Sequence, residues 1–118
     1  MSDSSLLLLV GGELMARARL QSATADRGME VKSVRPGALV DELETLRPSM
    51  LVLDLDTGRH VVLDELERAR AAGLAPERVL GYFSHVEQEL GEAARAAGCE
   101  AYPRGRFWRD LQTLLVSA

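Results

Sequence analysis

The sequence predicts an α/β fold of three layers, in which helices cover both faces of a doubly wound, five-stranded parallel sheet. Two apolar runs, Leu6–Val10 and Met50–Leu55, are interrupted only by Asp54 and are too short for ordinary helices. Runs of this kind are typical of strands buried on both faces of a sheet. Stretches with helical apolar spacing alternate with the predicted strands, and short loops join them. The 118 residues can bury one core, so we expect a single domain over residues 1–118.

The first half of the chain is predicted to alternate strands and helices. The strand Leu6–Val10 ends at Gly11-Gly12, and a helix follows over about Glu13–Arg27. Polar and apolar residues alternate over Glu30–Val34, which is typical of an edge strand. The next helix covers about Ala38–Leu46. The residues expected to face the core from these two helices are Leu14, Ala18, Ala25, Leu39, Leu43 and Leu46.

The third strand, Met50–Leu55, is predicted to be the centre of the sheet. Pro48 precedes it, and Thr57-Gly58 mark its end. A helix is expected over about Val61–Ala72, and the fourth strand over Arg78–Phe83. The residues expected to face the core from this helix are Val62, Leu66 and Ala69.

The last third of the chain begins with Ser84-His85-Val86-Glu87, which has the form of a capping box. In such a box a serine hydroxyl and a glutamate carboxylate bind two amides at the start of a helix. That helix is expected to end at Gly98, and a short strand, Cys99–Tyr102, follows. The last helix covers about Phe107–Val116. The residues expected to face the core from these two helices are Val86, Leu90, Ala93, Ala94, Ala97, Leu111, Leu114 and Leu115.

The strand order follows from the hydrophobic patterns. The first and third strands are apolar throughout and must lie centrally, whereas the alternating second strand suits an edge. Because crossovers between parallel strands are right-handed, the order 2-1-3-4-5 satisfies both conditions. This order is expected to bring Gly11, Gly12, Asp54 and the start of the third helix to one crevice at the carboxyl edge of the sheet, where α/β proteins place their ligands.

Composition excludes several classes of function. The 18 acidic and 14 basic residues give a net charge of −4, which argues against nucleic-acid binding through a basic surface. The apolar run near the N-terminus has only five residues, so we expect neither a signal peptide nor a membrane span, and a cytoplasmic location. The single cysteine, Cys99, excludes an internal disulfide and a cysteine-rich zinc site.

Two segments resemble the receiver domains of response regulators. Pro48 to Leu55 is similar to the family's third strand with its phospho-accepting aspartate, and Ala97-Gly98-Cys99-Glu100-Ala101-Tyr102 is similar to the approach to its fifth strand. The chain therefore resembles the CheY-like receiver domain, a flavodoxin-like fold, over essentially its whole length. The resemblance implies that Asp54 takes the phosphoacceptor position, the carbonyl of Asp56 a metal-binding position, and Tyr102 the aromatic switch position.

The sequence also departs from the receiver pattern at three places. Gly11 and Gly12 replace a pair of acidic residues, and Arg104-Gly105-Arg106 replaces a lysine followed by proline. Phe83 aligns with the hydroxyl switch position, and Ser84 lies one place later. Mg²⁺ is usually held by carboxylates, and phosphoryl transfer to an aspartate depends on such cations. We therefore expect a degenerate pseudo-receiver without metal or cofactor, with Mg²⁺ only if Asp54 is phosphorylated after all.

Each candidate residue also has a purely structural interpretation. Asp54 could be a capped or ion-paired carboxylate at a strand end, and Gly11-Gly12 a tight turn instead of a phosphate cradle. Ser84 is expected to cap the following helix, and a lone loop histidine such as His85 is usually solvated, although it could bind a ligand. The loop arginines Arg104 and Arg106 could either pair with Asp54 or remain solvated.

The leading functional hypothesis is a non-enzymatic signalling domain that interacts with a protein partner or a second copy without phosphorylation. The resemblance places the interface on the helix before Gly98, the strand Cys99–Tyr102 and the last helix, with Trp108 as a possible aromatic anchor. No nucleic acid or membrane is expected as partner. Two alternatives remain open: a working phosphoacceptor at Asp54, and a flavodoxin-like small-molecule binder that uses the same crevice.

Overall fold

Five parallel strands form one sheet in the order β2-β1-β3-β4-β5, as the hydrophobic patterns predicted. The structure, a computed structural model, describes residues 5–116 apart from the side chains of residues 58–60. Both the α/β class and the strand order are thus confirmed. The strands are β1 (Ser5–Val10), β2 (Met29–Val34), β3 (Met50–Asp54), β4 (Arg78–Phe83) and β5 (Glu100–Pro103).

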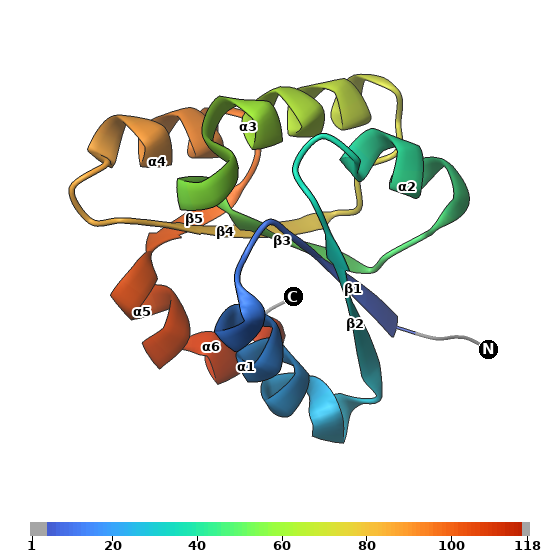
Figure 1. The fold of residues 1–118 in the computed structure, drawn as a ribbon, viewed down its shortest axis with the longest axis vertical. Coiled ribbons are helices and arrows are strands. Elements are labelled where there is room, and N and C mark those ends of the chain that lie inside the picture. Colours follow the sequence, from blue (N-terminus) through green and yellow to red (C-terminus); the bar gives the residue numbers. More distant parts are fainter. Residues whose placement is uncertain (1–4, 117–118) are drawn as a thin grey trace.

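Helices cover both faces of the sheet, so the molecule has three layers (Figure 1). One layer holds α1 (Leu14–Thr24), α5 (Arg104–Arg109) and α6 (Leu111–Val116), and a short 3₁₀ helix, η1 (Ala25–Arg27), extends α1. The other layer holds α2 (Leu39–Thr45), α3 (Leu55–Ala71) and α4 (Gln88–Ala96). Within residues 5–116, no helix is long and apolar enough to cross a lipid bilayer.

The core consists of two hydrophobic clusters, one on each face of the sheet. Residues of one strand alternate between them: Leu8 packs under the layer of α2, α3 and α4, and Leu9 packs under α1, α5 and α6. The register pairs Leu8 with Leu51 and Leu9 with Val52, and all four side chains are fully buried. Burial on both faces explains why β1 and β3 contain almost only apolar residues.

The prediction of the buried face of α1 was wrong. Leu14, Ala18 and Ala25 are exposed, and Leu14 retains 81% of its surface. The predicted set of residues and the set that is buried both have helical spacing, so spacing alone did not distinguish them. The stripe that lies on the sheet contains Leu20, which is fully buried, and the hydroxyl of its buried threonine donates to the Leu20 carbonyl (2.7 Å). The buried residues of α1 are Ala16, Leu20 and Thr24.

The third helix begins six residues earlier than the expected start at Val61. In α3 the first residue, Leu55, follows β3 directly, so Thr57-Gly58 lie inside the helix and do not precede it. The cause is Asp54, whose carboxylate accepts the Asp56 and Thr57 amides as an N-cap. The predicted core residues of this helix, Val62, Leu66 and Ala69, are all buried.

The capping box predicted at Ser84 is not formed, and α4 begins only at Gln88. The amide of Ser84 is bound by the Asp56 carboxylate (2.8 Å), and Glu87 occupies the N-cap position without a capping bond from its side chain. Val86 therefore lies outside the helix and is 70% exposed, and Ala93 is exposed as well. The buried residues of α4 are Leu90, Gly91 and Ala94.

The last predicted helix is divided into α5 and α6, which meet at Asp110. It also begins earlier than expected, at Arg104, because Pro103 ends β5 and occupies the N-cap position with a φ of −55°. Arg104 and Arg106, expected in a loop, are therefore helical. Of the predicted core residues, Leu111 and Leu115 are buried and Leu114 is partly buried.

A fully buried glutamate joins two helices of one layer. Glu65 of α3 has no exposed surface, and its two carboxylate oxygens accept the amides of Gly37 and Leu39, each at 2.8 Å. These amides belong to the start of α2, which has no side-chain cap of its own. Glu65 therefore caps α2 from a neighbouring helix.

Replacing this carboxylate should destabilise the protein strongly. Glu65→Ala leaves two amides without an acceptor, so we expect the free energy of unfolding to fall by about 2–4 kcal/mol in urea titrations. Glu67→Ala, at an exposed position of the same helix, should change it by less than about 0.5 kcal/mol. Equal losses in the two variants would contradict the capping role of Glu65.

Candidate functional site

The carboxyl ends of β1 and β3 and the start of α3 meet in one crevice. The loop after β1 is held by the Gly11 amide, which donates to Val34, and the Gly12 amide lies 3.5 Å from the Thr57 hydroxyl. Both glycines have positive φ values, 78° and 81°, which L side chains rarely adopt. The predicted meeting of Gly11, Gly12 and Asp54 at this edge is therefore present in the structure.

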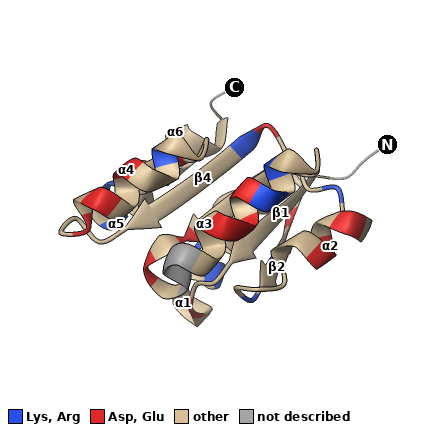
Figure 2. Ribbon diagram, turned by 90° about the horizontal axis from the view of Figure 1, so that it is seen from above, with Lys and Arg blue, Asp and Glu red and all other residues tan. Residues whose placement is uncertain are grey.

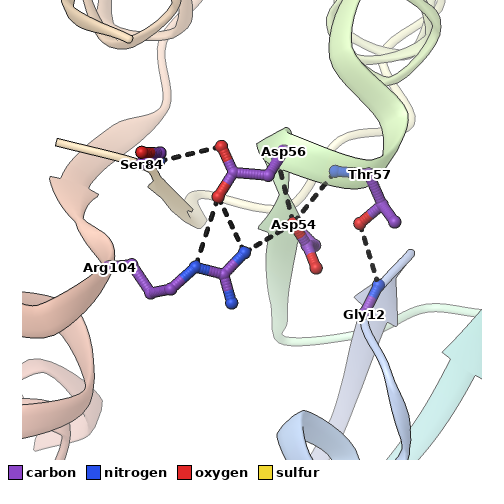
Figure 3. A network of polar contacts seen from close by, with 6 residues as sticks. All are labelled: Gly12, Asp54, Asp56, Thr57, Ser84 and Arg104. Carbon is purple, nitrogen blue, oxygen red and sulfur yellow. Dashed lines mark hydrogen bonds and ion pairs between the residues drawn. The ribbon is translucent and has the colours of Figure 1, made fainter. Parts of the chain in front are cut away.

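Asp54 is the most buried carboxylate of this crevice, with only 4% of its surface exposed. Its Oδ1 atom accepts the amides of Asp56 (3.0 Å) and Thr57 (3.2 Å). The same oxygen lies 3.6 Å from Nη2 of Arg104. Both kinds of contact expected for Asp54 are present: it accepts backbone amides and it lies beside an arginine. Of the two candidate arginines, Arg104 forms this ion pair (Figure 3).

Asp56 binds Arg104 more closely than Asp54 does. Its Oδ2 atom accepts from Nη2 (2.7 Å) and Nε (3.3 Å) of Arg104, and its Oδ1 atom accepts the Ser84 amide. Partial burial disfavours the charged guanidinium, but the hydrogen bond to Asp56 and the charge of Asp54 outweigh it and raise the pKa of Arg104. Figure 3 shows the guanidinium between the two carboxylates, so one cation neutralises both.

Tyr82 lies beneath this network and is fully buried. It pairs with Asp54 in the register of β3 and β4, and the guanidinium of Arg104 lies 5.0 Å from its ring centroid. Its hydroxyl has no hydrogen-bond partner among the described residues. Burial, and next the negative charge of Asp54, raise the pKa of the Tyr82 phenol. Sequence reasoning missed Tyr82, which only the pairing of β3 with β4 would have placed beside Asp54.

Three of the predicted candidates lie apart from Asp54. His85 is exposed, and its carbonyl accepts from the Gln88 side chain. Arg106 lies over the ring of Tyr102 (5.5 Å), and its Nε atom is 3.6 Å from Asp110. Burial, then the charge of Glu100, raises the pKa of Tyr102. Ser84 does reach the network, but through its backbone amide and not its hydroxyl.

A cavity of about 280 Å³ opens above the network, lined by Glu13, Asp54, Asp56, Thr57 and Arg104. Among the described residues, no group of three or more His, Cys, Asp or Glu side chains is arranged to hold a metal ion. Oδ1 of Asp54 and both carboxylate oxygens of Asp56 already accept backbone amides or Arg104, and Gly11 and Gly12, which have no side-chain ligand, follow β1. The donor set of this crevice does not fit a divalent cation.

Comparison with solved structures identifies the fold. A response regulator from Thermotoga maritima is 13% identical, with a TM-score of 0.74 over 97% of this chain and 99% of that chain. Vibrio cholerae CheY4 is 14% identical, with a TM-score of 0.76 over 95% and 96% of the two chains. The chain has the CheY-like receiver fold. The resemblance predicted from the sequence is thereby confirmed at the level of the fold.

A third structure with the receiver fold is the CheY-like protein tadZ of Pseudomonas aeruginosa. It is 18% identical, with a TM-score of 0.69 over 95% of this chain and 97% of that chain. No protein-family model matches the sequence, and comparison with curated proteins finds no match. This chain thus has the backbone fold of a receiver, although its sequence differs from those of the compared structures at most positions.

The unpartnered hydroxyl of Tyr82 predicts how stability depends on pH. Because folding raises the pKa of Tyr82, the unfolded chain loses this proton first, and stability falls as the pH rises above about 10. Tyr82→Phe should leave the free energy of unfolding near neutral pH within about 1 kcal/mol of the wild type. In urea titrations at rising pH, the variant should lose stability less steeply than the wild type. If wild type and variant lost stability equally as the pH rose, the raised pKa of Tyr82 would be contradicted.

Proposed function

We propose that this chain is a receiver-like signalling domain that acts through protein interaction, without phosphorylation of Asp54. The observation that carries the proposal is the guanidinium of Arg104, which binds Asp56 at 2.7 Å and lies 3.6 Å from Asp54. A permanent cation from the protein itself thus neutralises the carboxylate at the phosphoacceptor position.

The chemistry of phosphoryl transfer supports this proposal. Transfer to a carboxylate requires an accessible oxygen in line with the donor and cations that neutralise the charge of the transferred group. Asp54 is 4% exposed, and its Oδ1 atom already accepts two amides. The guanidinium of Arg104 lies 3.6 Å from this same oxygen. The role proposed here is therefore that of a signalling module and not of an enzyme.

A phosphodonor experiment tests this part of the proposal. After incubation with acetyl phosphate and Mg²⁺, intact-mass spectrometry should show the unmodified mass, because the crevice does not fit the divalent ion. A receiver domain with an intact acidic pair, treated in parallel, should gain a phosphate and so validate the reaction conditions. A phosphate adduct that disappears in Asp54→Asn would establish the alternative function, a working phosphoacceptor.

The proposed interface for a protein partner or a second copy is the face of α4, β5 and α5. Glu89 and Glu92 are exposed on α4, whereas Arg95 is engaged within the fold because it donates to the Ala101 carbonyl (2.8 Å). Trp108 packs against α1, where Arg19 lies over its ring, and so it does not supply the anchor expected for this face.

We further propose a cytoplasmic location, which suits a signalling module of this kind.

Charge reversal on α4 tests this interface. Glu89→Arg with Glu92→Arg should weaken self-association in sedimentation velocity, or capture of the partner in pull-downs, by about tenfold. A matched pair on α3, Asp64→Arg with Glu67→Arg, reverses the same charges at exposed positions and should have little effect. If the wild type remains monomeric at high concentration and both pairs capture a partner equally well, this face is not the interface.

A further inference from the structure

The hydroxyl of Tyr82 is the only buried polar side-chain atom of the described residues that has no hydrogen-bond partner. The side chain as a whole has no exposed surface, so the hydroxyl is also cut off from bulk water. Burying a hydroxyl without a partner is costly, and phenylalanine would fill almost the same space without that cost. An unsatisfied group of this kind needs a physical explanation.

The carboxylate of Asp54 lies beside this hydroxyl. The two residues are partners in the register of β3 and β4. Burial raises the pKa of the phenol most and the charge of Asp54 raises it next, yet their contact does not have the geometry of a hydrogen bond. An ionised carboxylate offers about four acceptor positions, and backbone amides use two of those of Asp54. Asp54 can therefore accept a further hydrogen bond from the phenol.

Arg104 is the present ionic partner of Asp54 and also lies over the ring of Tyr82. Its guanidinium is 3.6 Å from Oδ1 of Asp54 and 5.0 Å from the centroid of the ring. The side chains of Asp54 and Tyr82 are buried, whereas that of Arg104 is 39% exposed. Exposed side chains change rotamer readily. Of these three groups, Arg104 is therefore the one that can turn away towards solvent.

The ring of Tyr82 is held in place independently of Arg104. Its centroid lies 4.9 Å from that of Phe107 and 5.2 Å from that of Trp108, and Phe107 is fully buried. Counted from Arg104, these residues of α5 are three and four positions further along the chain, which places all three on one face of the helix. Departure of the guanidinium would thus leave the ring and its hydroxyl beside Asp54.

We propose that Tyr82 is a reserve hydrogen-bond donor for Asp54, and that Arg104 acts as a latch with a closed and an open position. In the closed position, which the structure shows, the guanidinium pairs with Asp54 and Asp56. In the open position Arg104 turns towards solvent and the phenol donates to Asp54, so that the buried carboxylate keeps a partner. Asp56 retains its bond to the Ser84 amide. The inference rests on the role given to Arg104 in the proposed function.

The latch connects the crevice with the face proposed above as the interface. Arg104 is the first residue of α5, so its open position places a positive charge at one end of that face. The other helix of the face, α4, carries acidic residues (Figure 2). Opening would therefore change the pattern of charge that a partner meets. The two positions of one side chain are the two-state element that a coupling between crevice and interface requires.

A double-mutant cycle in urea titrations tests the reserve donor. Arg104→Ala should raise the equilibrium constant for unfolding about tenfold more in the Tyr82→Phe background than in the wild type, because only the wild-type phenol can replace the lost cation. Tyr102→Phe is the matched control, since this tyrosine lies beside Tyr82 in the register of β4 and β5 but its hydroxyl bonds Glu100. Arg104→Ala should have the same effect with or without Tyr102→Phe.

A second measurement needs only the single variant Arg104→Ala. Its crystal structure should show the Tyr82 hydroxyl at about 2.5–3.0 Å from the Asp54 carboxylate. Additive effects in the cycle would overturn the proposal, as would failure of Arg104→Ala to fold while Tyr82 is present. A wild-type crystal structure in which the hydroxyl already binds Asp54 or an ordered water would do the same. Phosphorylation of Asp54 would instead overturn the proposed function and leave the result of the cycle unchanged.

Discussion

The contact of Arg104 with Asp54 and Asp56 is the interaction on which the carboxyl edge of the sheet depends. Two carboxylates two residues apart would repel each other in a crevice where Asp54 is almost completely buried. One guanidinium neutralises both, and backbone amides donate to Oδ1 of each aspartate. Removing the cation would leave buried charge without a partner, which is usually more costly than the pair itself is favourable. The network therefore ties β3, the end of β4 and α5 into one unit.

This network also lies beside the starts of three helices. The carboxylate of Asp54 caps α3 and starts it directly after β3, so no loop separates strand from helix. Asp56 binds the amide of Ser84, and α4 starts only at Gln88. Arg104 is the first residue of α5, and its side chain reaches back to Asp56. The start of α3 thus follows from a local cap, whereas the side chains of Asp56 and Arg104 join segments that are distant in the sequence.

The sequence was sufficient for the fold and the strand order, because the strands themselves follow from local patterns, whereas it left open which arginine, if either, pairs with Asp54. Apolar runs identify buried strands, and glycines and prolines mark their ends. The buried face of α1 was not predictable from spacing, since two stripes have the same period and only packing against the sheet selects Leu20. The position of Tyr82 beside Asp54 was missed, because it depends on the strand register. The packing of Trp108 against α1 was likewise not predicted, because it depends on the position of α1 against α5.

The backbone itself favours glycine at positions 11 and 12, where the resemblance would place an acidic pair. Gly11 and Gly12 both have positive φ, where an L residue costs about 1–2 kcal/mol. A Cβ atom on Gly11 would lie 3.2 Å from the Thr57 hydroxyl, and one on Gly12 would lie 3.0 Å from the Leu9 side chain. Carboxylates at these positions would therefore strain the loop and crowd α3, and they would still face a crevice whose aspartates are paired with Arg104. Two acidic residues in place of Gly11 and Gly12 would thus change the charge of the crevice but would not fit its present geometry, because Gly11 lies close to Thr57 of α3 and Gly12 lies close to Leu9.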